Sequence, residues 1–205
     1  MTLPDWKAED YYFANFEPIT YSGLLVNAPI ELKVFKVLKY LNDTVIPDAM
    51  KAILNGAELS GLLLVFSIVD YLAEFYSGKS TKSKDIVRFM EKYFPSVYQP
   101  YLNDIYQHIR CGLVHNLSLL NPWYKNSCSF KLIRKSKYHL QFKDGFIIFS
   151  MVTFVIDTSR AIAMYLHDVI SEGKDSLIRE NFEKRFNRKD AASAFIEKTN
   201  DDYES

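Results

Sequence analysis

The stretch AELSGLLLVFSIVDYLAEFY, residues 57–76, decides the fold class. Apolar residues would lie on nearly all faces of a helix formed by this stretch, so we expect a helix that is buried on most sides. Ser77-Gly78 follows it, and glycine is the residue that most often comes just after a helix end. The sequence on both sides of this core helix carries further helical patterns.

Apolar residues recur at helical spacing from Ile30, and we expect Pro47 to end or restart that helix before a short helix that reaches residue 54. Glycine and proline number seven each, which favours helices over a turn-rich β fold. Further helices are predicted over residues 85–94, 98–116, 145–170 and 175–187. The sequence therefore predicts an all-α fold, a helical bundle.

A chain of 205 residues is long enough for one domain with a substantial core. Residues 30–187 hold all the predicted helices and contain no linker, so we expect a single helical domain there. Residues 1–29 contain three prolines and many aromatic residues, which is typical of an irregular arm packed on the main body or on a partner. Residues 188–205 are polar and are predicted to be a flexible tail.

One segment departs from the helical pattern. Apolar and polar residues alternate on both sides of residues 134–137, which predicts a short β-hairpin inserted near residues 128–142, with a loop as the alternative. Four cations gather around this segment and would suit the guidance of RNA, or a solvated turn: Lys131, Arg134, Lys135 and Lys137.

The chain carries 25 basic and 25 acidic residues, so a broad electrostatic attraction to nucleic acid is not expected. Binding of phosphate must then come from a local patch, or from a groove built by two subunits. Cys111 and Cys128, without a secretory signal, predict reduced thiols in the cytoplasm. The apolar runs 61–69 and 145–156 are too short to span a bilayer, so no membrane segment is expected.

The stretch YQHIRCGLVHN, residues 106–116, carries the densest chemistry of the chain. Arg110 stands inside an apolar helical pattern, where its charge is costly unless it meets an anion or a carboxylate. His115 follows five residues later and can exchange protons near neutral pH. Together they would offer a phosphate clamp and an acid/base group.

Two other interpretations of this stretch compete with phosphate chemistry. Arg110 would form a structural salt bridge, with Asp104, Asp70 or Asp157 as partner, and His115 would cap the helix end. Alternatively a metal would bind to His108, Cys111 and His115. These residues share one helix face with Asp104, because the four are spaced four, three and four apart. Three ligands on one helix rarely complete a tetrahedron, so we predict no metal and no other cofactor.

The sequence Arg110-Cys111-Gly112-Leu113-Val114-His115 resembles the R-x4-6-H signature of the HEPN superfamily (higher eukaryotes and prokaryotes nucleotide-binding domains). The motif ends a predicted helix, and long apolar helices precede and follow it, as in the helical bundles of that family. The resemblance covers residues 57–172.

The resemblance implies a metal-independent endoribonuclease that works as a homodimer, with two copies of the motif facing each other. Arg110 would bind the scissile phosphate and stabilise its developing charge. His115 would act as the general base or the general acid, leaving a 2′,3′-cyclic phosphate and a 5′-hydroxyl. Such proteins serve as toxins or defence effectors, and an antitoxin or regulatory protein would be a further partner.

Five further residues are candidates for a supporting role beside Arg110 and His115. Active members often carry a polar residue directly after the arginine, where this chain has Cys111, and Asn116 offers an amide one position after the histidine. Tyr106, one turn before Arg110, would stack on the guanidinium or belong to the core. His108 would contact RNA or lie exposed without a role. Asp70, which ends the apolar run 61–69, would pair with Arg110 or Arg160.

Two other classes of function stay open on the sequence. The same cleft would serve a non-catalytic helical dimer that binds a nucleotide, RNA or a protein partner. In the third interpretation, Arg110 ties helices together in a structural accessory protein.

Overall fold

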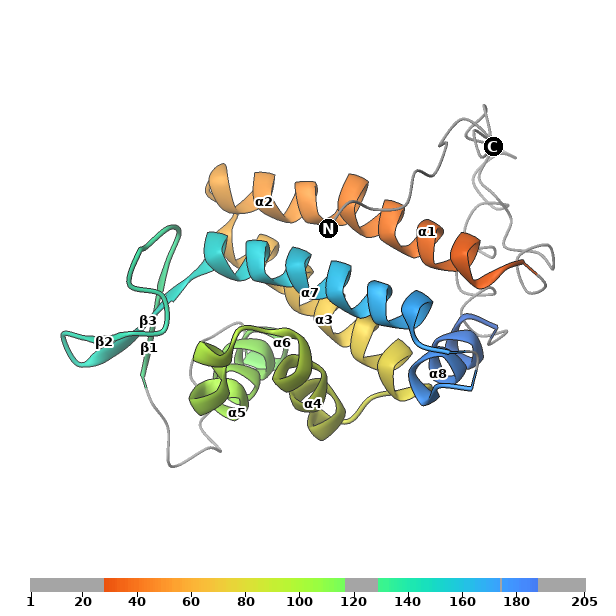
Figure 1. Cartoon of the computed structure of the whole chain (residues 1–205). Coiled ribbons are helices and arrows are strands. Elements are labelled where there is room, and N and C mark those ends of the chain that lie inside the picture. Colours follow the sequence, from red (N-terminus) through yellow and green to blue (C-terminus); the bar gives the residue numbers. More distant parts are fainter. Residues whose placement is uncertain (1–27, 117–128, 174, 188–205) are drawn as a thin grey trace. The chain divides into compact units, whose positions relative to one another are not determined.

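Helix α3, Glu58–Ser77, is the central element of the bundle and confirms the core helix predicted over residues 57–76. In the computed structural model, which describes residues 28–116, 129–173 and 175–187, α3 contacts α2, α4, α7 and α8 (Figure 1). Gly78 ends it in the left-handed conformation, with φ of 67°. By length and composition alone α3 also qualifies as a membrane span, as core helices of soluble proteins do, and half of its apolar window is buried here.

Residues 29–187 form one compact unit. Its other long helices are α4 (Ser83–Tyr93), α7 (Met151–Ser171) and α8 (Leu177–Phe186). Figure 1 shows α7 between the segment α1–α2 and the segment α4–α6, with α3 behind it, and α7 contacts α1, α2, α3 and α4. The predicted arm and tail, residues 1–27 and 188–205, lie outside the described residues.

The sequence predicted that Pro47 ends or restarts the first helix, and in the structure a new helix starts at this proline without a break in the helical segment. α1 (Ile30–Tyr40) leads into a π-helical turn, η2 (Leu41–Val45), and then into α2 (Ile46–Leu54). Pro47 stands at the start of α2, where its missing N–H is tolerated. The Ile46 N–H bonds to the Leu41 carbonyl, five residues back, so the widened turn carries the chain into the proline without a break.

The segment between α4 and the sheet is built of short helical pieces. A 3-10 helix, η3 (Ser96–Tyr101), is followed by α5 (Leu102–Asp104), a π-helical turn η4 (Ile105–Arg110) and α6 (Cys111–Asn116). The sequence predicted one helix over residues 98–116, and its core stripe is confirmed because Leu102, Ile105, Ile109 and Leu113 are all buried.

The predicted β-hairpin near residues 128–142 is wrong in its pairing, and the structure has a three-stranded sheet instead. β1 (Phe130–Ile133) pairs in parallel with β3 (Phe146–Ser150), and β2 (Phe142–Lys143) pairs with β3 in the antiparallel sense. The helix predicted from residue 145 therefore begins only at Met151. Cys128 lies outside the described residues.

The turn between β2 and β3 explains this difference. Lys143 pairs with Phe146, so Asp144 and Gly145 form a two-residue loop, and both have positive φ, 52° and 83°. Asp-Gly with two positive φ angles is the turn that joins twisted antiparallel strands most readily. This dipeptide was the signal in the sequence for a strand after the turn. The signal was not used because the apolar run 146–149 resembles part of a buried helix as much as a strand.

A chain of hydrogen bonds ties the sheet to the bundle. The Tyr98 hydroxyl donates to Asp157 Oδ2 over 2.9 Å and lies 2.8 Å from His139 Nε2. The Ser150 N–H donates to His139 Nδ1 over 2.9 Å. Because Tyr98 gives its one proton to the carboxylate, we infer that His139 is neutral and protonated at Nε2. Burial agrees with this state, since it lowers the pKa of His139 to about 4.

The contact between α2 and α3 gives a first prediction. A Cβ atom on Gly61 would lie 2.6 Å from both the Ala49 carbonyl oxygen and Ile53 Cγ1. Alanine normally favours a helix over glycine by about 1 kcal/mol, but overpacking costs about 1–3 kcal/mol. We expect Gly61→Ala to lower the free energy of unfolding in urea by about 1–2 kcal/mol. Ser60→Ala, exposed on the same helix, is the control and should stay within about 0.5 kcal/mol of the parent.

The neutral state of His139 gives a second prediction. Below about pH 6.5 the unfolded chain binds a proton at this residue, whereas the folded chain does so only near pH 4. Stability should therefore fall as the pH is lowered from about 7 to 5, by on the order of 1 kcal/mol per pH unit for this residue. Burial lowers the pKa of His108 and adds to the slope, whereas it raises the pKa of Asp157 and opposes the slope at lower pH.

Chemical unfolding at several pH values measures this slope. It should become shallower in His139→Gln, and His167→Gln, whose side chain is 56% exposed, is the control. An equal slope in His139→Gln and the parent would contradict the assignment of this proton to His139.

Candidate functional site

Arg110 ends the π-helical turn η4 and reaches across to α3. Its Nε and Nη2 atoms both donate to Asp70 Oδ2, over 3.0 and 2.6 Å. The side chains of Arg110 and Asp70 keep 21% and 23% of their surface exposed. The predicted pairing of Asp70 with Arg110 is thereby confirmed, and Arg160 instead pairs with Asp157 over 3.3 Å.

Tyr106 holds the guanidinium from a second direction. The Cζ atom of Arg110 lies 5.6 Å from the centre of the Tyr106 ring, so the predicted stacking is confirmed. Burial raises the pKa of Tyr106 to about 12, and its interaction with the thiol of Cys111 acts in the same direction. The tyrosine therefore stays neutral, and Arg110 is held in a single orientation by a ring and a carboxylate.

Asp70 is incompletely satisfied. Its Oδ1 atom is buried and has no hydrogen-bond partner among the described residues. Burial raises the pKa of the Asp70 carboxyl above its usual value, and the hydrogen bonds from Arg110 offset only part of that increase. A buried acceptor without a partner costs about 1–3 kcal/mol. Such arrangements are found more often at functional sites than elsewhere.

The π-helical turn changes which residues share a face. The Cys111 N–H bonds to the Tyr106 carbonyl, five residues back, so this turn holds more residues than an α turn. His108 is consequently buried, at 4% exposed, while His115 is exposed. His108 was predicted to contact RNA or to lie exposed without a role, and its burial in the folded chain contradicts both alternatives. Single π turns inside helices are frequent at functional sites.

His115 lies on α6, with its side chain exposed. Within the described part of the chain, no hydrogen bond or ion pair joins it to Arg110. The structure thus brings Arg110, Asp70, Tyr106 and Cys111 together and leaves His115 open to solvent nearby in the chain. The side chain of Asn116 lies outside the described residues.

The alternative metal site is not supported. Among residues 28–116 and the described part of 129–187, no three histidine, cysteine, aspartate or glutamate side chains are placed to hold a metal ion. His108, Cys111 and His115 differ in burial, because the π turn separates them around the helix.

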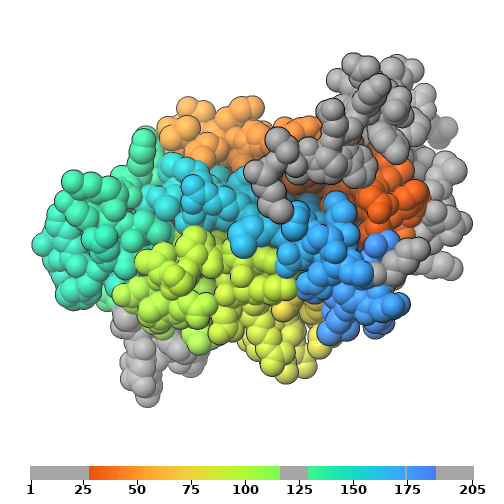
Figure 2. All heavy atoms as spheres, in the orientation of Figure 1, coloured from red at the N-terminus to blue at the C-terminus, as the bar shows by residue number. Residues whose placement is uncertain are grey.

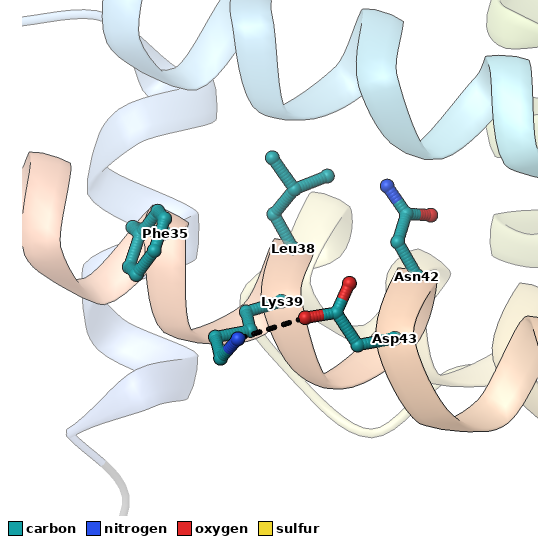
Figure 3. A pocket seen from close by; sticks show the side chains of 5 residues that line it. All are labelled: Phe35, Leu38, Lys39, Asn42 and Asp43. Atoms are coloured by element: carbon teal, nitrogen blue, oxygen red, sulfur yellow. Dashed lines mark hydrogen bonds and ion pairs between the residues drawn. The ribbon is translucent and has the colours of Figure 1, made fainter. Parts of the chain in front are cut away.

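A pocket of about 240 Å³ lies elsewhere, along α1 and η2. Figure 3 shows that Leu38 and Asn42 project to the same side of this segment, whereas Lys39 meets Asp43 one turn later, over 2.9 Å. The two charged residues that line this pocket, Lys39 and Asp43, are bonded to each other. None of the lining residues belongs to the site around Arg110.

The chain has no significant match among protein-family models, curated proteins or solved structures. The HEPN resemblance therefore stays a prediction that rests on the motif at residues 110–115.

Three exposed residues of the sheet were not predicted as functional from the sequence: Phe142, Lys143 and Phe146. Phe142 fell at the end of the predicted hairpin and Lys143 directly after it, whereas Phe146 fell within the helix predicted from residue 145. The Asp144-Gly145 turn between Lys143 and Phe146 was a visible signal for the strand that follows it.

The ion pair between α3 and η4 gives a third prediction. Arg110→Ala would leave the Asp70 carboxylate half-buried without its cation, which we expect to lower the free energy of unfolding by about 1–3 kcal/mol. Asp70→Asn should cost less, because the amide still accepts a hydrogen bond. The double variant should lose less than the sum of the two losses, by about 1 kcal/mol or more in a double-mutant cycle. Additive losses in urea unfolding would contradict a direct coupling.

Proposed function

We propose that this protein is a metal-independent endoribonuclease of HEPN type, acting in the cytoplasm as a homodimer. One observation carries the proposal. The guanidinium of Arg110 is oriented by Asp70 and the Tyr106 ring, yet it keeps 21% of its side chain exposed, five residues before an exposed histidine. The cleavage of a phosphodiester requires a fixed cation and a group that can exchange protons, and the motif supplies one residue of each kind.

The N–H donors of Arg110 are not all used by Asp70, which suits the binding of a phosphate. Asp70 takes the Nε and Nη2 hydrogen bonds through a single oxygen, and Nη1 has no partner among the described residues. Nη1 would donate to a non-bridging oxygen of the phosphate, where negative charge grows in the transition state. Since the guanidinium is already oriented, little reorganisation is needed when that charge develops.

The reaction is an attack of the ribose 2′-hydroxyl oxygen on the adjacent phosphorus, with departure of the 5′-oxygen of the next nucleotide. The proton of the 2′-hydroxyl passes to one imidazole, and the leaving oxygen receives a proton from another. His115 of one subunit cannot fill both roles in a single step, so the second role falls to His115 of the other subunit. The products are a 2′,3′-cyclic phosphate and a 5′-hydroxyl.

A toxin or defence effector of this kind needs to be silenced between uses, so an antitoxin or regulatory protein is part of the proposal. The exposed position of His115 would make it accessible to such a partner.

A second candidate is a non-catalytic dimer that binds a nucleotide, RNA or a protein partner. Two observations favour it. Arg110 already carries an ion pair with Asp70, and Cys111 stands where active HEPN proteins often have a polar residue. In this candidate the same guanidinium binds an anion without turnover.

A cleavage assay in EDTA gives a fourth prediction and separates the two candidates. We expect the full chain to cut single-stranded RNA, with the 2′,3′-cyclic phosphate detected by mass spectrometry. His115→Ala should lower the rate by about 10²–10⁴-fold and Arg110→Ala by about 10²–10³-fold. Arg110→Lys should also lose most activity, because an ammonium lacks the fork that Asp70 orients.

Matched controls are present in the chain. Arg88→Ala and His167→Ala remove an exposed arginine and an exposed histidine away from the motif, and both should keep full activity. Intact RNA after incubation with the folded parent protein would favour the binding candidate. Cleavage that persists in His115→Ala would overturn the mechanism.

A further inference from the structure

The three-stranded sheet carries a concentration of positive charge that the whole chain lacks. The chain as a whole is neutral, but residues 129–146 hold five cations and one carboxylate, Asp144. Figure 2 shows this part of the chain (teal) at one end of the described bundle, away from α8. Arg134 is engaged by Glu58 of α3. The remaining four cations are exposed: Lys131, Lys135, Lys137 and Lys143.

Aromatic rings are exposed among these cations. Phe142 is 73% exposed, Phe146 42% and Tyr138 37%, although the core of the same sheet buries Phe149 completely. Exposed aromatic side chains add little to the stability of a monomer. Three of them close together in the chain therefore indicate a surface that binds a ligand. β2, which carries Phe142, is an edge strand of the sheet.

Two of the rings lie with the cations on one side of the sheet. Lys143 and Phe146 are paired across β2 and β3, so their side chains leave the sheet on the same side. Phe142 precedes Lys143 in β2 and therefore leaves the sheet on the opposite side. Lys143 Nζ lies 4.6 Å and Lys137 Nζ 5.1 Å from the centre of the Tyr138 ring. Exposed rings of Phe146 and Tyr138 are thus found together with two ammonium groups.

Single-stranded nucleic acid has the complementary pattern, because each nucleotide joins a flat base to a phosphate. Bases stack on aromatic side chains while lysines follow the phosphates. A membrane surface fits less well, since insertion needs a continuous apolar wedge and Lys143 stands between Phe142 and Phe146 in sequence. An acidic protein partner would use the lysines but would leave the exposed rings without a planar partner.

We propose that the sheet is a binding surface for single-stranded RNA, in which Tyr138 and Phe146 stack on bases and Lys137 and Lys143 contact phosphates. That the bound strand is also the substrate of Arg110 and His115 rests on the proposed function; the binding itself does not. We refer to these four residues as the sheet surface.

The test is fluorescence anisotropy of the full chain with a labelled 12-nucleotide RNA. Its riboses are 2′-O-methylated, so attack by the 2′-oxygen is blocked and binding is measured without cleavage. We expect Tyr138→Ala and Phe146→Ala each to weaken binding by about 5-fold to 100-fold. Lys137→Ala combined with Lys143→Ala should also make the slope of log affinity against log salt shallower by about 1.4.

Controls remove similar groups elsewhere on the protein. Leu177→Ala removes an apolar side chain that is 68% exposed, and Lys84→Ala removes an exposed lysine on α4; both should bind as the parent does. Thermal unfolding of all variants checks that the fold is kept, which the exposure of the substituted residues favours.

The outcomes are distinct. Equal binding by the parent and the sheet-surface variants would overturn the proposal, and so would binding of the duplex form as tightly as the single strand. Binding of anionic lipid vesicles but not of RNA, with loss in Phe146→Ala, would assign the surface to a membrane and overturn it. RNA binding that depends on the sheet surface supports it even if unmodified RNA stays intact, in which case the nuclease alone fails. If the parent cleaves RNA but the sheet-surface variants bind it as tightly as the parent does, the nuclease proposal stands and the proposal for the sheet surface is overturned.

Discussion

The ion pair between Arg110 and Asp70 is the contact on which the candidate site depends. It joins the core helix α3 to the π-helical turn η4, two segments forty residues apart in sequence. A guanidinium placed among apolar residues is tolerable only when an anion or a carboxylate meets it, and Asp70, which ends the apolar run 61–69 of α3, supplies that carboxylate. The same contact aims the arginine, because Asp70 and the Tyr106 ring leave it one orientation. The ion pair that joins the two segments is therefore also the contact that orients the Arg110 guanidinium.

The π turn at Ile105–Arg110 gives the motif its geometry. In a regular α-helix, residues 108 and 115 would share a face, and both histidines would be open to solvent. The widened turn instead buries His108 and leaves His115 exposed. The motif therefore presents one titratable imidazole to solvent, and the arginine is turned toward α3. In the proposed mechanism, the second imidazole would come from a second subunit.

In the two proposals, two separate regions of the chain would contact RNA. The site around Arg110 offers one oriented cation and suits a single phosphate. The sheet surface offers exposed rings and lysines and would suit several nucleotides. His139, which lies half-buried next to this surface, is neutral at neutral pH because burial lowers its pKa to about 4. A chain without net charge can bind a polyanion in this way, because the cations are concentrated rather than spread over the surface.

The sequence by itself determined the helical bundle and the inner contacts of the motif. Periodic apolar residues specify helices locally, and a charged residue in an apolar run restricts its partners to a few, so the pairing of Arg110 with Asp70 and its stacking on Tyr106 were predictable. Only the tertiary structure decided the sheet and the burial of His108. The parallel pairing of β1 with β3 joins strands that are not neighbours in the chain, and an apolar run such as residues 146–149 reads equally as helix or strand until its partner is known. The π turn likewise depends on packing, since no local pattern marks the one extra residue that rotates a helix face away from solvent.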